Sequence, residues 1–177
     1  MLNKTTDRAF IFIAGPFGAG KSAFIAAVSD PGRTARTITR VVGGQRWRYD
    51  YGRITVADDL AVHLLAHPGA RRFDVARELP PGTLGCVLLV SSVEPETFRE
   101  ARAMMTHCLS RCPVPFIVAA SKQDHPDALS LPDVRAALMV PPEVPLVPCV
   151  ATDGDSVRRV LIRLLHEVIS RLGDETQ

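Results

Sequence analysis

An eight-residue run near the N-terminus constrains the fold more than any other part of this chain. Residues 15–22 read Gly-Pro-Phe-Gly-Ala-Gly-Lys-Ser and match the pattern G-x-x-x-x-G-K-[ST] at every defined position. The apolar run 9–14 before it has the length of a buried parallel strand, and the run 23–28 after it is typical of a helix. This motif binds phosphate groups when it lies between a strand and a helix. The sequence therefore predicts a phosphate-binding loop.

The residues of this run have distinct expected roles. Its three glycines let backbone amides face an anion, and the start of the helix adds partial positive charge. Lys21 is expected to reach the β- and γ-phosphates of a nucleotide and stabilise their charge, and the Ser22 hydroxyl is expected to ligate Mg²⁺. The predicted nucleotide-binding residues here are Gly15, Pro16, Phe17, Gly18, Ala19, Gly20, Lys21, Ser22 and Ala23.

Length and composition predict a single domain and argue against nucleic acid and membranes as partners. With 177 residues, 46% of them hydrophobic, the chain can form one compact core but not two, so we expect a single domain over 1–177. The net charge of +2 provides no broad field for nucleic acid, and we expect no such partner. Apolar runs fall far short of the roughly 18 residues of a membrane helix, and residues 1–8 do not resemble a signal peptide. We therefore expect a cytoplasmic protein without a membrane segment.

Strand-like and helix-like segments alternate along the chain. This order predicts an α/β fold with helices on both faces of a mostly parallel sheet. The expected strands cover 9–14, 47–56, 60–65, 86–90, 115–120 and 144–150, and the expected helices cover 23–28, 95–112, 133–139 and 155–172. Because the connection between the second and third strands is so short, these two must pair as an antiparallel hairpin. The prediction is a six-stranded sheet with one antiparallel edge strand.

Two segments lack clear periodicity and are expected to be functional loops. Residues 29–44 are rich in Thr, Arg and Gly and are long for a simple connection. Residues 67–82 contain two Pro-Gly turns around a charged stretch, which predicts an irregular helix of low stability. Both are candidate switch loops.

The cysteines are typical of a reduced protein and not of a disulfide framework. Cys86 and Cys149 fall within apolar strands, where small buried thiols are common. Cys108 and Cys112 lie four apart on the apolar stripe of an expected helix, without further metal ligands nearby in the sequence. We predict that they pack in the core and do not form a metal or redox pair.

A second motif follows the expected strand at 115–120. Residues 121–124 read Ser-Lys-Gln-Asp, which closely resembles the N-K-x-D guanine motif of Ras-like small GTPases, with Ser121 in the place of Asn. In that family the Asp carboxylate accepts hydrogen bonds from N1 and the 2-amino group of guanine, which adenine cannot supply, and the Lys stem lies along the base. The resemblance implies that Ser121, Lys122 and Asp124 form the guanine site.

Further segments extend the resemblance over almost the whole chain. Residues 67–69 are similar to part of the D-T-P-G-Q stretch of the second switch, and residues 48–54 resemble the second strand of prokaryotic Ras-like GTPases of the MglA type. Residues 149–152 stand where the family has its S-A-K loop, which implies that Ala151 and Thr152 meet the base. The resemblance implies one small-GTPase domain with the three-layer P-loop NTPase fold and GTP or GDP as its ligand. It also implies a regulator of the roadblock or longin kind at the switches.

Departures from the family pattern fall on the groups that handle Mg²⁺ and the attacking water. The family's second-switch Asp aligns with Ala66, and its water-orienting Gln aligns with Ala70. Asp58 and Asp59 lie at the opposite end of the strand that precedes this switch, so we expect neither to reach the metal. These changes predict a weakened Mg²⁺ site and slow hydrolysis of GTP.

The switch segments offer candidates for the missing groups, but none stands out as catalytic. The threonines of the first candidate switch, residues 29–44, are Thr34, Thr37 and Thr39. Of these, Thr39 is the preferred candidate to join Ser22 as a metal ligand. Arginines crowd both segments, and Arg40 or Arg71 is a candidate for stabilising the charge of a transferring phosphoryl group. His67 is a candidate for positioning water.

Three functions are consistent with these motifs. The first is a guanine-nucleotide switch with slow or partner-dependent GTP hydrolysis. The second is a pseudo-GTPase scaffold that binds nucleotide without hydrolysing it, which the alanines at the two switch positions favour. The third is a P-loop kinase, which predicts an acid at a strand end and leaves the segment at 121–124 unexplained.

Overall fold

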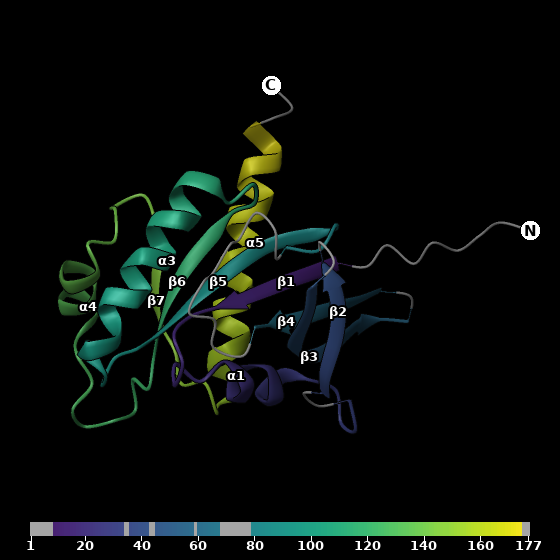
Figure 1. Cartoon of the computed structure of the whole chain (residues 1–177), viewed down its shortest axis with the longest axis horizontal. Helices are drawn as coiled ribbons and strands as arrows, with labels where there is room; N and C mark the ends of the chain where they lie inside the picture. Colours follow the sequence, from purple (N-terminus) through teal and green to yellow (C-terminus); the bar gives the residue numbers. More distant parts are fainter. Residues whose placement is uncertain (1–8, 34–35, 43–44, 59, 68–78, 175–177) are drawn as a thin grey trace, which may run out of the picture.

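The computed structural model describes residues 9–33, 36–42, 45–58, 60–67 and 79–174. In this part of the chain, one sheet of seven strands runs through the molecule between helices (Figure 1). The strands are β1 (Ala9–Ala14), β2 (Arg36–Val42), β3 (Gln45–Ala57), β4 (Leu60–Ala66), β5 (Thr83–Ser91), β6 (Phe116–Ser121) and β7 (Leu146–Pro148). The helices are α1 (Lys21–Val28), the short 3₁₀ helix η1 (Pro95–Thr97), α3 (Phe98–Arg111), α4 (Leu131–Leu138) and α5 (Gly154–Asp174).

The strand order is β2-β3-β4-β1-β5-β6-β7. Strand β3 runs antiparallel to both β2 and β4, and the remaining neighbours pair in parallel. In Figure 1, β2, β3 and β4 lie on the right of the view, and α3 and α4 lie on the left. The predicted α/β class, the mostly parallel sheet and the β3–β4 hairpin are therefore confirmed.

Strand β1 lies inside the sheet, and its sequence explains why. Ile11 and Ile13 point into one buried cluster, and Phe12 and Ala14 point into another. Because both faces of the strand are covered, the sequence is continuously apolar and does not alternate with polar residues. The first cluster contains residues of α1 and α5, and the second contains residues of α3 and α4, so the sheet is the middle of three layers.

The sheet differs from the prediction at its antiparallel end. Residues 29–44 were expected to form a loop, but residues 36–42 form strand β2, which pairs with β3 from Arg36 opposite Tyr51 to Val42 opposite Gln45. The prediction of six strands is therefore wrong, and the antiparallel strand is second from the edge, not at it. The β-branched residues of this segment favour a strand, but the arginines and threonines among them hide the apolar pattern of a buried strand.

Other boundaries shift by a few residues. Strand β7 is shorter than the predicted 144–150, and α4 begins at Leu131 because Ser130 caps it by accepting a hydrogen bond from the backbone N of Asp133, at 3.3 Å. The irregular helix expected within 67–82 falls mostly on residues 68–78, which lie outside the described residues. Each described helix is too short or too polar to cross a membrane.

Candidate functional site

The glycine-rich loop at 15–20 joins the end of β1 to the start of α1, where the sequence analysis expected it. Gly15, Gly18 and Gly20 have backbone φ angles of 148°, 81° and 95°, which residues other than glycine rarely adopt. A Cβ atom on Gly15 would lie only 2.1 Å from the carbonyl oxygen of Leu89 on β5. The close approach of this loop to β5 therefore requires glycine at position 15.

Two other loops lie against the glycine-rich loop. A Cβ atom on Gly20 would lie 3.2 Å from the Cβ of Ala151, which follows β7. A Cβ atom on Gly18 would lie 3.4 Å from a carboxylate oxygen of Glu94, which follows β5. These contacts place the loops after β5 and β7 beside the glycine-rich loop, at the carboxyl edge of the parallel strands, where ligands bind in open α/β sheets.

Lys21 is the buried cation of the site, with only 7% of its surface exposed. Its Nζ donates hydrogen bonds of 2.8 Å to the carbonyl oxygens of both Gly15 and Pro16, so the side chain folds back over its own loop. Burial lowers the pKa of Lys21 to about 8, against the opposing effect of the Glu100 and Asp50 carboxylates. The ammonium group is therefore mostly protonated at neutral pH, and it lies within the loop predicted to bind phosphate.

Ser22, in the first turn of α1, is bonded to an acid that the sequence analysis did not identify. Its Oγ donates a 2.5 Å hydrogen bond to Oδ2 of Asp50, which lies on β3. In the register of β3 and β4, Asp50 is directly opposite Ala66. Counting residues backward from the β3–β4 turn would have placed Asp50 beside Ala66. By itself, however, an acid in the middle of a strand between two tyrosines does not indicate a functional residue.

His67 directly follows the last residue of β4 and is partly buried. Burial lowers its pKa, and the charge of Lys21 lowers it further. Its ring stands edge-on to that of Tyr49, with ring centres 5.8 Å apart. The imidazole is therefore mainly neutral at pH 7, and its expected role in positioning water stays a prediction.

The segment 121–124 is tied to the glycine-rich loop by its first residue. Ser121 is fully buried, and its Oγ lies 2.8 Å from the carbonyl oxygen of Ala19 and 3.0 Å from that of Val90. Lys122 has a φ of 60°, and its Nζ forms a 2.8 Å ion pair with Glu94. That ion pair is the main reason why the pKa of Glu94 lies below its usual value. Asp124 is exposed at the surface of the same loop.

Hydrogen bonds join the loops after β5, β6 and β7 to one another. The Nε2 of Gln123 donates to Ser92 Oγ at 2.6 Å, and the backbone N of Ser92 donates to the Ser121 carbonyl at 3.0 Å. The backbone N of Cys149 donates to the Ala120 carbonyl at 2.8 Å. We call residues 15–22, 91–94, 121–125 and 149–153 the loop cluster. Its members are far apart in sequence but are bonded or packed against one another.

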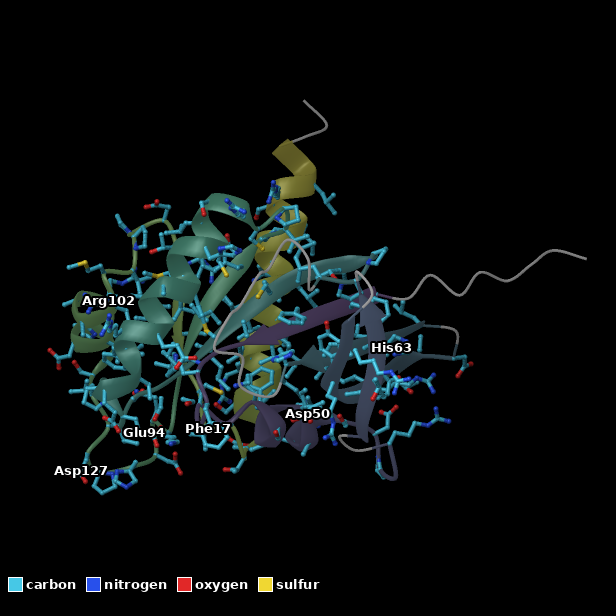
Figure 2. All side chains as sticks on the ribbon, viewed as in Figure 1. Phe17, Asp50, His63, Glu94, Arg102 and Asp127 are labelled. Carbon is cyan, nitrogen blue, oxygen red and sulfur yellow. The ribbon has the colours of Figure 1, made fainter. Side chains whose placement is uncertain are left out.

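The loop cluster brings together most of the predicted binding residues. Ala151 is buried against Gly20, and Thr152 next to it is exposed. Phe17, in the glycine-rich loop, is 83% exposed. In Figure 2, Phe17, Glu94 and Asp50 lie along the lower edge of the molecule, where α1 begins. Residues of the predicted phosphate and guanine sites thus share one edge of the sheet.

The remaining switch candidates lie on β2 or outside the described residues. Thr39 is exposed on β2, opposite Arg48 of β3, and Arg40 follows it in the same strand. Arg71, Ala70 and Thr34 lie outside the described residues. Asp58 lies in the turn between β3 and β4, at the far end of both strands from Asp50 and Ala66. The sequence analysis considered only Asp58 and Asp59 as acids that might approach Ser22, but the acid bonded to Ser22 is Asp50, on the strand next to β4.

The cysteines are core residues. Cys86 lies in the buried cluster beneath α3, Cys108 of α3 is buried next to Cys86, and Cys112 packs against that cluster. Burial raises the pKa of Cys112 to about 11 and that of Cys149 to about 12, so both thiols stay protonated at neutral pH. Among the described residues, no three His, Cys, Asp or Glu side chains group as metal ligands.

A search against protein-family models found no match for this chain. The fold and the site define an α/β protein with a glycine-rich loop, a buried lysine and an Asp-bonded serine at one edge of its sheet.

Proposed function

We propose that this chain is a guanine-nucleotide-binding switch that hydrolyses GTP slowly or with the help of a partner. The observation that carries the proposal is the loop cluster itself. It joins a glycine-rich loop containing a buried ammonium group to the segment 121–124 through the Ser121 hydroxyl. Phosphates and base of one ligand would then be held by parts of a single bonded structure.

The phosphate end of the proposal rests on Lys21 and α1. The Lys21 ammonium group is bonded to two carbonyl oxygens of its own loop, and phosphate oxygens are stronger acceptors for it because they are charged. The amino end of α1, which begins at this lysine, adds partial positive charge. When a nucleotide binds, the Lys21 ammonium group would therefore exchange its neutral carbonyl acceptors for charged phosphate oxygens.

The base end rests on Asp124. Its carboxylate accepts hydrogen bonds only, so it matches the adjacent N1 and 2-amino donors of guanine and not the edge of adenine. Lys122 neutralises the Glu94 carboxylate beside the glycine-rich loop, which reduces the repulsion that this acid would exert on phosphates. Ala151, packed against Gly20, brings its backbone to the same edge.

Slow hydrolysis follows from the alanines. Ala66 is buried and apolar at the end of β4, and Ala70 has no side-chain group that could orient water. The same alanines favour the second candidate, a scaffold that binds nucleotide without cleaving it. A regulator of the roadblock or longin kind that accelerates GTP turnover would support the switch, and the scaffold predicts no acceleration.

Calorimetric titration with GDP and with ADP, each with and without Mg²⁺, tests the proposed function. We expect GDP to bind at least about 30-fold more tightly than ADP, since the paired hydrogen bonds to Asp124 are worth about 2 kcal/mol or more. Tighter binding of ADP would overturn the guanine assignment and favour a kinase. A second assay compares GTP turnover of the wild type with that of Ala70→Gln, and increased turnover would show that the rest of the site is competent.

A further inference from the structure

The bond between Ser22 and Asp50 joins α1 to β3 at the start of the helix. Ser22 Oγ and Asp50 Oδ2 are 2.5 Å apart, which is typical of a hydroxyl donating to a charged carboxylate. Paired residues on antiparallel strands have side chains on the same face of the sheet, so Asp50 and Ala66 face the same layer. That layer contains α1 and the loop that precedes it.

The direction of this bond matters for a cation. A serine hydroxyl has one proton and two lone pairs. When its proton is given to Asp50, the lone pairs are left to face a metal ion, and the negative carboxylate favours the positive charge. Mg²⁺ prefers hard oxygen ligands such as a hydroxyl, phosphate oxygens and water, so the Ser22–Asp50 pair fits it.

We propose that Asp50 is the positioning carboxylate of a Mg²⁺ site at Ser22. It acts from β3, on the strand next to the position where Ala66 provides no carboxylate. This inference rests on the proposed function, since the metal would be bound together with nucleotide phosphates. The sequence analysis expected a weakened Mg²⁺ site because Ala66 stands where the resembling family has an Asp. Under this proposal the site keeps an acid, which the neighbouring strand supplies.

A purely structural role for Asp50 is the alternative to be excluded. The chain offers a matched bond for comparison, because Asp30 joins the other end of α1 to the same strand. Its Oδ2 accepts from Thr55 Oγ1 at 2.7 Å, and its backbone N donates to the carbonyl of Arg53 at 2.8 Å. Asp30→Asn therefore weakens an α1–β3 connection away from the glycine-rich loop.

The experiment measures GDP affinity across a Mg²⁺ titration and in EDTA, for the wild type, Asp50→Asn and Asp30→Asn. We expect Asp50→Asn to raise the half-saturating Mg²⁺ concentration about 10- to 100-fold, the usual cost of losing an acid that orients a metal ligand. Its GDP affinity in EDTA should stay within about twofold of the wild type, since no metal is then involved. Asp30→Asn should leave both quantities unchanged.

The outcomes separate this inference from the proposed function. An unchanged Mg²⁺ requirement in Asp50→Asn, or an equal loss of GDP affinity with and without Mg²⁺, overturns the role of Asp50 while guanine binding stands. Wild-type protein that fails to bind GDP under any condition overturns both.

A double-mutant cycle tests whether Asp50 acts through Ser22. Ser22→Ala removes the proposed ligand, so adding Asp50→Asn to it should raise the Mg²⁺ requirement by no more than about twofold. Fully additive effects would show that Asp50 acts independently of Ser22 and would contradict the proposal.

Discussion

The loop cluster and the three-strand region β2–β3–β4 lie on opposite sides of the start of α1, and they differ in how they are connected to it. In the loop cluster, segments that are distant in sequence are joined by several hydrogen bonds, among them Ser121 to Ala19 and Gln123 to Ser92. From the three-strand region, Asp50 reaches the site through its bond to Ser22. The loop cluster, which we propose holds the nucleotide, is therefore bonded together without a ligand, whereas the proposed metal site depends on a single bond between α1 and β3.

The largest expected effect comes from Lys21. Lys21→Ala would remove the two or more charge-assisted hydrogen bonds to phosphate that we propose for this lysine, so we expect GDP and GTP affinity to fall by at least about 4 kcal/mol, roughly 1,000-fold. Calorimetry measures the loss, with Arg158→Ala as a control because that cation is exposed and paired with Asp155 on α5. A loss below about tenfold would show that the loop cluster does not hold phosphates through this lysine.

Gly15→Ala tests how tightly the loop cluster is packed. The new Cβ would overlap the carbonyl oxygen of Leu89 at 2.1 Å in a backbone conformation unfavourable to alanine, so the free energy of unfolding should fall by about 4 kcal/mol. Gly32→Ala is the matched control, because its φ is also positive at 73° but, among the described residues, no atom lies within 4 Å of a Cβ there. Urea unfolding of both variants should show a loss of only about 1 kcal/mol for Gly32→Ala. Equal losses of unfolding free energy in the two variants would mean that the backbone at Gly15 can move away from β5 at little cost.

The lowered pKa of Lys21 predicts a pH dependence of stability in the protein without nucleotide. The folded chain binds fewer protons than the unfolded chain between about pH 8 and 10.5, so the free energy of unfolding gains a contribution that rises with pH across this range. Relative to Lys21→Met, the wild type should gain up to about 3 kcal/mol. Urea unfolding at several pH values measures this difference. A constant difference would show that burial does not oppose the charge of Lys21.

The smallest of these effects concerns the base. Asp124→Asn replaces one of two acceptor oxygens by a donor, and we expect GDP binding to weaken by about 2–3 kcal/mol with ADP binding unchanged. Asp127→Asn is the control, since Asp127 is an exposed acid three residues further along (Figure 2). Calorimetric titration of both variants makes the comparison. Unchanged GDP affinity in Asp124→Asn would remove the guanine assignment and leave the loop cluster a general phosphate site.

The buried parallel strands and the glycine-rich loop were predictable because their signals are local. Strand β1 is continuously apolar from Ala9 to Ala14, and the loop after it needs glycines wherever its φ angles are positive. Strand β2 was not predictable in the same way. Its stability depends on pairing with β3, and its own residues mix arginines and threonines with β-branched apolar ones.

The sequence by itself determined where the glycine-rich loop at 15–22 lies, which segments form the buried strands on both sides of β1, and that the segment at 121–124 follows a buried strand. These features are readable because burial and positive φ angles restrict which residues each position accepts. Tertiary structure alone decided which acid approaches Ser22. Asp50 and Ala66 are 16 positions apart in the printed sequence, and only the hairpin register places them side by side. A metal site depends on distances between side chains from different elements, and those distances are fixed by strand pairing and helix packing.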